Sequence, residues 1–194
     1  MIALDFETDV RTGDPVCVSV SEGAAPSLHV GEDMRRVVDR ILASGETIAA
    51  HNAAFDASCM ARLVGVRPVL DAYSDRRIAC TMVTEILRDV ASEGDTDPRG
   101  YALDRVAARH GASVSPDKSN PWRLRFGELA GVPLDAWPPD AVRYALEDAS
   151  AAHEIATRQG DVTDARVQAA HAFWLGEAGR VGVRTDPARV EALR

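Results

Sequence analysis

The sequence has few cysteines and no long hydrophobic run. Its three cysteines, Cys17, Cys59 and Cys80, are an odd number without CxxC spacing, which argues against a disulfide framework and against a zinc knuckle. No apolar stretch approaches the roughly 18 residues that a membrane-spanning helix needs. Met1 leads straight into a strand-like segment, without a signal-peptide pattern. We therefore expect a protein of the reducing cytoplasm that makes no membrane contact.

Positive charge is also scarce. The 194 residues include 22 basic and 30 acidic side chains, for a net charge of −8, and Lys118 is the single lysine. This balance does not indicate a general polyanion-binding surface, so any contact with nucleic acid would have to be local. A cluster of carboxylates holding divalent cations would be such a place, because the cations cancel its charge. The hydrophobic content of 46% is enough for one full core.

Alternating apolar and polar residues predict strands in the first third of the chain. Residues 1–8 and 15–22 read as a β-hairpin, followed by a short strand at 27–30 and a buried strand at 47–52.

Apolar residues at helical spacing predict a second class of element. The helices are expected at residues 32–43, 53–64, 82–91, 101–110 and 137–160. Two segments rich in Gly, Pro and charge, 92–100 and 112–121, read as loops. Strands that come first and then alternate with helices favour an α/β fold with a mixed β-sheet flanked by helices.

The stretch "GDVTD" at 160–164 reads as a domain boundary. It predicts one domain over residues 1–160 and a short helical C-terminal extension over 161–194. Within the extension we expect a helix, a short strand "RVGVRT" at 180–185 and the start of another helix.

Asp5 and Glu7, in "IALDFET", share one face of the first strand because side chains alternate along a strand. Two carboxylates ~6.6 Å apart repel each other unless a positive charge lies near them. A hard divalent cation with oxygen ligands is the obvious candidate. The alternative is a strand whose second face is solvated.

Asp56 heads an apolar helical stripe that continues through Cys59, Met60 and Leu63. A buried carboxylate needs a partner, and a metal ion or its bound water would be one. The alternative is that Asp56 merely favours the positive end of the helix, with Asn52 as its N-cap.

Asp148 and Tyr144 lie one turn apart on the long helix at 137–160. Small alanines on the same face would let this helix approach a neighbour closely, with the Asp148 carboxylate beside them. A phenol at position 144 could orient a water molecule. The alternative for Tyr144 is an amphipathic side chain at the edge of the core.

In order along the chain, "LDFET", "HNAAFD", "WRLRFGEL" and "YALEDA" resemble the DEDD superfamily of 3′→5′ exonucleases, in its tyrosine-bearing branch, which has a ribonuclease H-like fold. Within it, residues 1 to about 158 resemble the proofreading exonuclease domain of a bacteriophage family A DNA polymerase. Residues 161–194 resemble the start of such a polymerase domain. The histidine-bearing branch would need a His five residues before Asp148, where this chain has Arg143.

The resemblance implies an enzyme of DNA replication or repair that hydrolyses the terminal phosphodiester of single-stranded DNA to a nucleoside 5′-monophosphate. Asp5, Glu7 and Asp148 would hold one Mg²⁺ or Mn²⁺ ion, and Asp5 with Asp56 a second, about 3.5–4 Å away. Tyr144 would position the attacking water. A polymerase domain in the same or another chain is an expected partner, and the bacteriophage likeness implies the host cytoplasm.

The resemblance also implies substrate contacts. Thr8 would contact the terminal nucleotide, and Asn52 and Phe55 would grip the end of the strand. Phe55 could stack on a base, which is worth roughly 1–3 kcal/mol and tolerates any base. Plain core packing is its alternative. Five basic residues near the two loops could track the strand, or could be ion-paired surface residues: Arg76, Arg77, Lys118, Arg123 and Arg125.

One departure from many polymerase-linked relatives concerns Cys80, which stands where they have an Asp before the Thr of "CTM". It puts a local helix cap in doubt. Two other functions remain open on the sequence alone. An exoribonuclease of the ribonuclease D type uses the same five residues, and a domain that has lost catalysis would only bind a strand or brace a polymerase.

Overall fold

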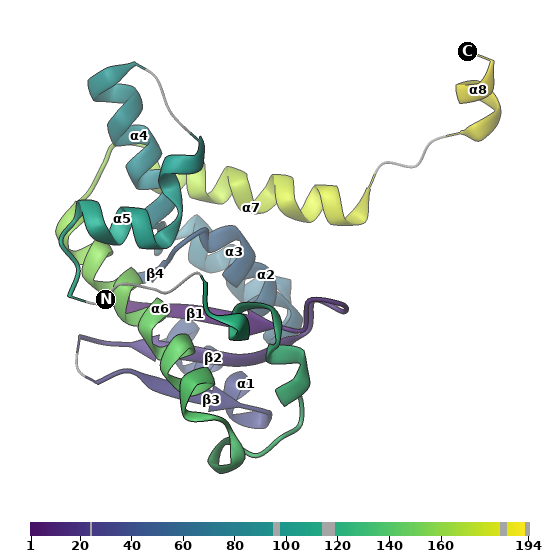
Figure 1. Ribbon diagram of the computed structural model, residues 1–194. Helices are drawn as coiled ribbons and strands as arrows, with labels where there is room; N and C mark the ends of the chain where they lie inside the picture. The colour runs from purple at the N-terminus through teal and green to yellow at the C-terminus, as the bar shows by residue number, and fades with distance from the viewer. Residues whose placement is uncertain (24, 95–97, 114–118, 183–185, 193–194) are drawn as a thin grey trace.

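The centre of the molecule is a five-stranded mixed sheet. The computed structural model describes residues 1–23, 25–94, 98–113, 119–182 and 186–192. The sheet order is β3-β2-β1-β4-β5. The strands, shown in Figure 1, are β1 (Ile2–Thr8), β2 (Pro15–Ser21), β3 (Ser27–Val30), β4 (Ile48–Ala50) and β5 (Ile78–Cys80). The first three pair antiparallel, and β4 and β5 run parallel to β1. The α/β fold class with a mixed sheet is confirmed.

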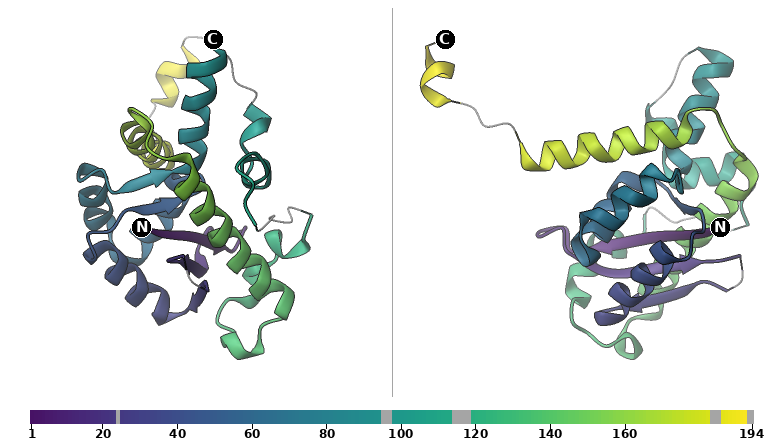
Figure 2. Two further views of the ribbon diagram at one scale, coloured as in Figure 1. Left: turned by 90° about the vertical axis from the view of Figure 1, so that its left-hand side faces the viewer. Right: turned by 180° about the vertical axis from the view of Figure 1, so that it is seen from behind.

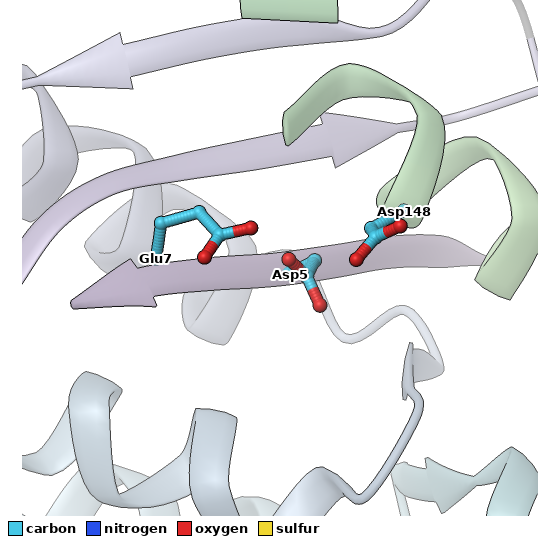
Figure 3. A group of neighbouring side chains, drawn as sticks. All are labelled: Asp5, Glu7 and Asp148. Carbon is cyan, nitrogen blue, oxygen red and sulfur yellow. The ribbon is translucent and has the colours of Figure 1, made fainter. Parts of the chain in front are cut away.

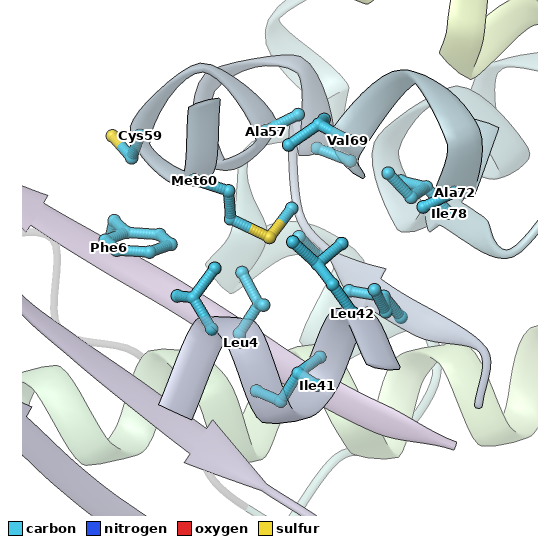
Figure 4. Packing of buried hydrophobic residues seen from close by; sticks show 14 of the residues in the cluster. Leu4, Phe6, Ile41, Leu42, Ala57, Cys59, Met60, Val69, Ala72 and Ile78 are labelled. Carbon is cyan, nitrogen blue, oxygen red and sulfur yellow. The ribbon is translucent and has the colours of Figure 1, made fainter. Parts of the chain in front are cut away.

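The alternation along β1 sends its two sets of side chains into different layers. Leu4 and Phe6 enter a core with three helices, α1 (Glu32–Ala43), α2 (Ala53–Val64) and α3 (Val66–Ser74). Figure 4 shows these residues meeting Met60 and Ile41 from the helices. On the opposite face, Ala3 packs against Ala152 of α6 (Pro139–Gln159). The sheet therefore lies between two helical layers, which Figure 2 shows from two further sides.

The remaining helices extend these layers. α5 (Leu103–Arg109) packs on α6 through Val106 and Ile155. α4 (Thr81–Glu93) starts directly after β5, and α7 (Ala165–Val181) places Phe173 in the core beside Tyr73, with ring centroids 5.0 Å apart. α8 (Pro187–Glu191) ends the described chain, and it lies away from the sheet in Figure 1. Among the helices of the described ranges, none is long and apolar enough to cross a membrane.

Several elements differ from the sequence-based expectation. α3 was not anticipated, nor were four short 3-10 helices: η1 (Pro98–Tyr101), η2 (Pro121–Leu124), η3 (Phe126–Leu129) and η4 (Leu134–Ala136). The helix expected at 101–110 is shorter, because Tyr101 closes η1 and α5 begins at Leu103. Parts of the two expected loops, residues 95–97 and 114–118, lie outside the described residues.

The short strand expected at 180–185 is wrong at its start. Arg180 and Val181 form the last turn of α7, and Gly182 then ends the helix with a φ of 74°. A glycine reaches this left-handed region without strain, so it terminates a helix readily. Residues 183–185 lie outside the described part of the chain.

Candidate functional site

Three carboxylates from β1 and α6 converge beside the sheet. Ligand oxygens of Asp5, Glu7 and Asp148 all lie within 4.8 Å of one another. Figure 3 shows Asp5 and Glu7 on the same side of β1, with Asp148 reaching toward them from α6. Their spacing and hard oxygen donors could hold a divalent cation.

Small residues bring the two elements together. On α6, Ala145, Ala149 and Ala152 are fully or almost fully buried, and the last of them contacts Ala3 of β1. Because none of these side chains extends beyond a methyl group, the helix lies close on the strand. Asp148, in the same turns of α6, is only 4% exposed. The expected role of the alanines is thus borne out by the packing.

Asp56 approaches β1 from the other layer. It is 1% exposed, and its Oδ1 accepts a hydrogen bond from the backbone N–H of Phe6 at 3.0 Å. This N–H lies between Asp5 and Glu7 in the chain. The second carboxylate oxygen of Asp56, Oδ2, is buried and has no hydrogen-bond partner among the described residues. Asp56 is not part of the group of three carboxylates whose oxygens lie within 4.8 Å.

The surroundings of Asp56 disfavour its charge. Burial is the main cause that raises the pKa of this carboxyl to about 8, and the charge of Asp148 acts in the same direction. The hydrogen bond from Phe6 acts against both and is too weak to offset them. Asn52 stands at the N-cap of α2, but with a φ of 61°, and its side chain makes no cap hydrogen bond. Asp56 therefore lies in the first turn of α2, where the helix end favours a carboxylate, and it is also deeply buried.

Tyr144 borders the carboxylates from α6. It is 3% exposed, and its ring lies against Phe126, with centroids 6.0 Å apart. Burial raises the pKa of the phenol, and the charges of Asp148, Glu7 and Asp5 raise it further. The phenol thus stays protonated at neutral pH and can donate a hydrogen bond.

All three predicted substrate contacts line one cleft with the site. The cleft has a volume of about 790 Å³, and Asp5, Glu7, Asp148 and Tyr144 line it together with Thr8, Asn52 and Phe55. Phe55 is 44% exposed. Its side chain is therefore not part of the closed core, and its ring is accessible to a planar ligand.

The wall of the cleft includes three residues without a predicted role, and it also includes Arg123, one of the basic candidates for strand contact. They come from α5 and the segment before it and from η2: Tyr101, Asp104, Arg105 and Arg123. His51 also lines the cleft, with its Nδ1 2.8 Å from the Thr81 hydroxyl and its Nε2 2.8 Å from the Tyr101 carbonyl oxygen. A carbonyl only accepts, so Nε2 is the protonated nitrogen in the neutral ring. The position of His51 directly before Asn52 was the sequence signal for its presence here.

The five basic candidates separate into different surroundings. Arg123 lines the cleft, whereas Arg125 pairs with Glu128 at 2.7 Å and stacks on Trp122. Arg77 donates to the carbonyl oxygen of Leu42 at 2.8 Å, and Arg76 lines another pocket. Lys118 lies outside the described residues.

Cys80 retains a capping role. At the N-cap of α4, its sulfur accepts hydrogen bonds from the N–H groups of Val83 at 3.5 Å and of Ala53 at 3.4 Å. The thiol therefore joins the ends of β5 and α4 to the start of α2. The helix cap that the sequence placed in doubt is present.

Comparisons with protein-family models, with curated proteins and with solved structures found no match to this chain. The function must therefore be inferred from the geometry of the site.

Proposed function

We propose that this protein is a metal-dependent 3′→5′ exonuclease that releases nucleoside 5′-monophosphates from single-stranded DNA. The observation that carries the proposal is the convergence of Asp5, Glu7 and Asp148 within 4.8 Å, from segments about 140 residues apart in the chain. Tyr144 and Phe55 line the same cleft. A mixed sheet between helical layers is compatible with the ribonuclease H-like fold that the sequence motifs imply.

The chemistry of the donors supports a divalent metal. Carboxylate oxygens are the ligands that Mg²⁺ and Mn²⁺ prefer, and the buried Oδ2 of Asp56 lacks a partner within the described chain. Asp5, Glu7 and Asp148 would hold one ion, and Asp5 with Asp56 would serve a second. When bound, the ions would supply Lewis-acid activation of water and of the leaving 3′ oxygen.

The protein's own groups would orient the reactants. Tyr144, kept neutral by its surroundings, would donate or accept a hydrogen bond at the attacking water and hold it in line with the terminal phosphodiester. Phe55 would stack on a base, and Thr8 and Asn52 would contact the terminal nucleotide. In replication or repair, such an activity would remove a mispaired 3′ end, with a polymerase domain as its partner.

The proposal is tested by a time course on two 5′-labelled single-stranded oligonucleotides, one DNA and one RNA, with Mg²⁺, Mn²⁺ or EDTA. We expect a ladder that shortens from the 3′ end of DNA and stops in EDTA. Asp5→Asn should lower the rate at least about 100-fold, since even residues that only support metal ligands contribute 10- to 100-fold. Asp39→Asn, an exposed carboxylate of α1, is the matched control and should retain full rate.

Three other outcomes would each change the proposed function. Equal or faster loss of RNA would identify the ribonuclease D type. Full activity of Asp5→Asn would refute the assignment of the site, and binding of DNA without shortening would identify a domain without catalysis.

A further inference from the structure

Most of the arginine side chains that the structure describes make a hydrogen bond or an ion pair with another group. Among the arginine side chains that the structure describes, which do not include those of Arg99, Arg184 and Arg194, all have a hydrogen bond or an ion pair except those of Arg76, Arg105 and Arg123. Acidic residues outnumber basic ones by 30 to 22, so a shortage of carboxylates does not explain the exceptions. Two of the three, Arg105 and Arg123, line the cleft that contains the carboxylate site.

The two arginines face the cleft from different elements. Arg105 lies on α5 and Arg123 on η2, and both are exposed. Their nearest basic neighbours in the chain are occupied: Arg109 pairs with Asp89 at 3.0 Å, and Arg125 pairs with Glu128 at 2.7 Å. Two of the three free guanidinium groups are therefore located at the cleft, and the third, that of Arg76, lines another pocket.

Their positive charge lies where a polyanion would otherwise be repelled. The carboxylates of the site make the floor of the cleft negative, and Asp104 adds an acidic group to the wall. Bound divalent cations would offset the carboxylates of the floor. The positive charge of Arg123 also reaches Tyr144. It lowers the pKa of the phenol, although burial and the nearby carboxylates raise that pKa by more.

From these observations we infer that Arg105 and Arg123 are phosphate-binding residues that make the cleft selective for a polynucleotide strand over a dinucleotide. The inference rests on the proposed function. Guanidinium groups on two walls can each bind a backbone phosphate upstream of the reacting one. Phe55 would stack on a base of the same strand.

The test compares Arg123→Gln, Arg105→Gln and the double variant with Arg125→Gln, an ion-paired arginine two residues from Arg123 that lies outside the cleft. Binding of a fluorescent ten-nucleotide DNA strand is measured in EDTA over a range of salt concentrations. Hydrolysis of the same strand and of a dinucleotide is measured with Mn²⁺. Thermal unfolding checks that each variant is folded.

We expect each cleft variant to weaken strand binding about threefold or more and to reduce the slope of log K against log salt by about 0.7, the value for one phosphate contact on a single strand. KM should rise more for the long strand than for the dinucleotide. Arg123→Lys should restore the salt slope. Arg125→Gln should match the wild type in every assay.

The outcomes separate the inference from the proposed function. If the wild type degrades DNA and the cleft variants behave like Arg125→Gln, the inference is wrong and the exonuclease stands. If the wild type binds the strand without degrading it and the cleft variants lose binding, the inference holds and the exonuclease is wrong. A wild type that neither binds nor degrades a strand overturns both.

Discussion

Asp56 and Glu85 are both buried carboxylates, 1% and 5% exposed, but their surroundings are opposite. Glu85 of α4 accepts hydrogen bonds from Nε2 of His110 at 2.7 Å and from the amide of Gln159 at 2.8 Å, and it lies 3.6 Å from the Arg109 guanidinium. Asp56 accepts one backbone N–H, and its other oxygen has no hydrogen-bond partner in the described part of the chain.

The pKa values follow this difference. Burial alone would raise the pKa of Glu85, but the hydrogen bonds from His110 and Gln159 outweigh it and hold the pKa below its ordinary value. No such set of donors surrounds Asp56, and its pKa rises to about 8. A buried acid that the protein itself satisfies serves the fold. The buried Oδ2 of Asp56, in contrast, has no hydrogen-bond partner in the described chain, and in the proposed function it would face a bound cation.

Replacing the Asp56 carboxylate with a neutral amide tests most directly whether this acid serves the site rather than the fold. We expect Asp56→Asn to lower nuclease activity about 100-fold or more, because the proposed second metal loses its ligand. The fold should persist, because the amide oxygen can still accept the N–H of Phe6 and the amide is neutral at every pH. Rates on labelled DNA and thermal unfolding in EDTA measure the two effects. A variant that cuts DNA at the wild-type rate would remove Asp56 from the site.

Glu85→Gln is the matched change at the other acid, and we expect it to lower stability while leaving activity unchanged. It removes the charge that His110 and Arg109 face, and we expect a loss of roughly 1–3 kcal/mol in the free energy of unfolding. Activity should stay near the wild-type value, since Glu85 does not line the cleft. Urea denaturation and the same DNA assay provide the readouts. A large loss of activity without a loss of stability would contradict the division of roles.

The two acids should have opposite effects on the pH dependence of stability in the metal-free protein. Asp56 has a raised pKa in the folded state, so its contribution to stability falls as pH rises from about 4 to about 8, by at most about 1.4 kcal/mol per pH unit. Glu85 has a lowered pKa, so its contribution is present above about pH 4.5 and is lost as pH falls below that value.

Unfolding free energies in EDTA across this range separate the two acids. Asp56→Asn should flatten the decline between pH 4 and 8, and Glu85→Gln should flatten the acid side. Identical pH profiles for the wild type and Asp56→Asn would mean that this carboxyl is not held in its neutral form.

Local patterns predicted much of the fold. The hairpin β1–β2, the strand β3 and the helix α1 have strong alternating or helical periodicity, and these patterns survive in the structure. α3 was not anticipated; its Pro68 lies in the first helical turn, where a proline is tolerated. Its buried Val69, Ala72 and Tyr73 have the i, i+3, i+4 spacing that could have indicated it.

Two further outcomes depended on distant parts of the chain. Whether Phe55 packs in the core or opens to a cleft is not encoded in its neighbours, because the cleft wall comes from α5 and η2. The free state of Arg105 and Arg123 likewise depends on which carboxylates lie within reach after folding. The sequence contained the candidates but not their partners.

By itself, the sequence determined which carboxylates face inward, because the alternation of a strand and the period of a helix are local properties. It thereby singled out Asp5, Glu7, Asp56 and Asp148. Only the tertiary structure decided that three of these acids converge while Asp56 stays buried behind Phe6 with a raised pKa. Convergence requires β1 and α6 to lie against each other, and a pKa depends on all the charges and dipoles that folding assembles around a group.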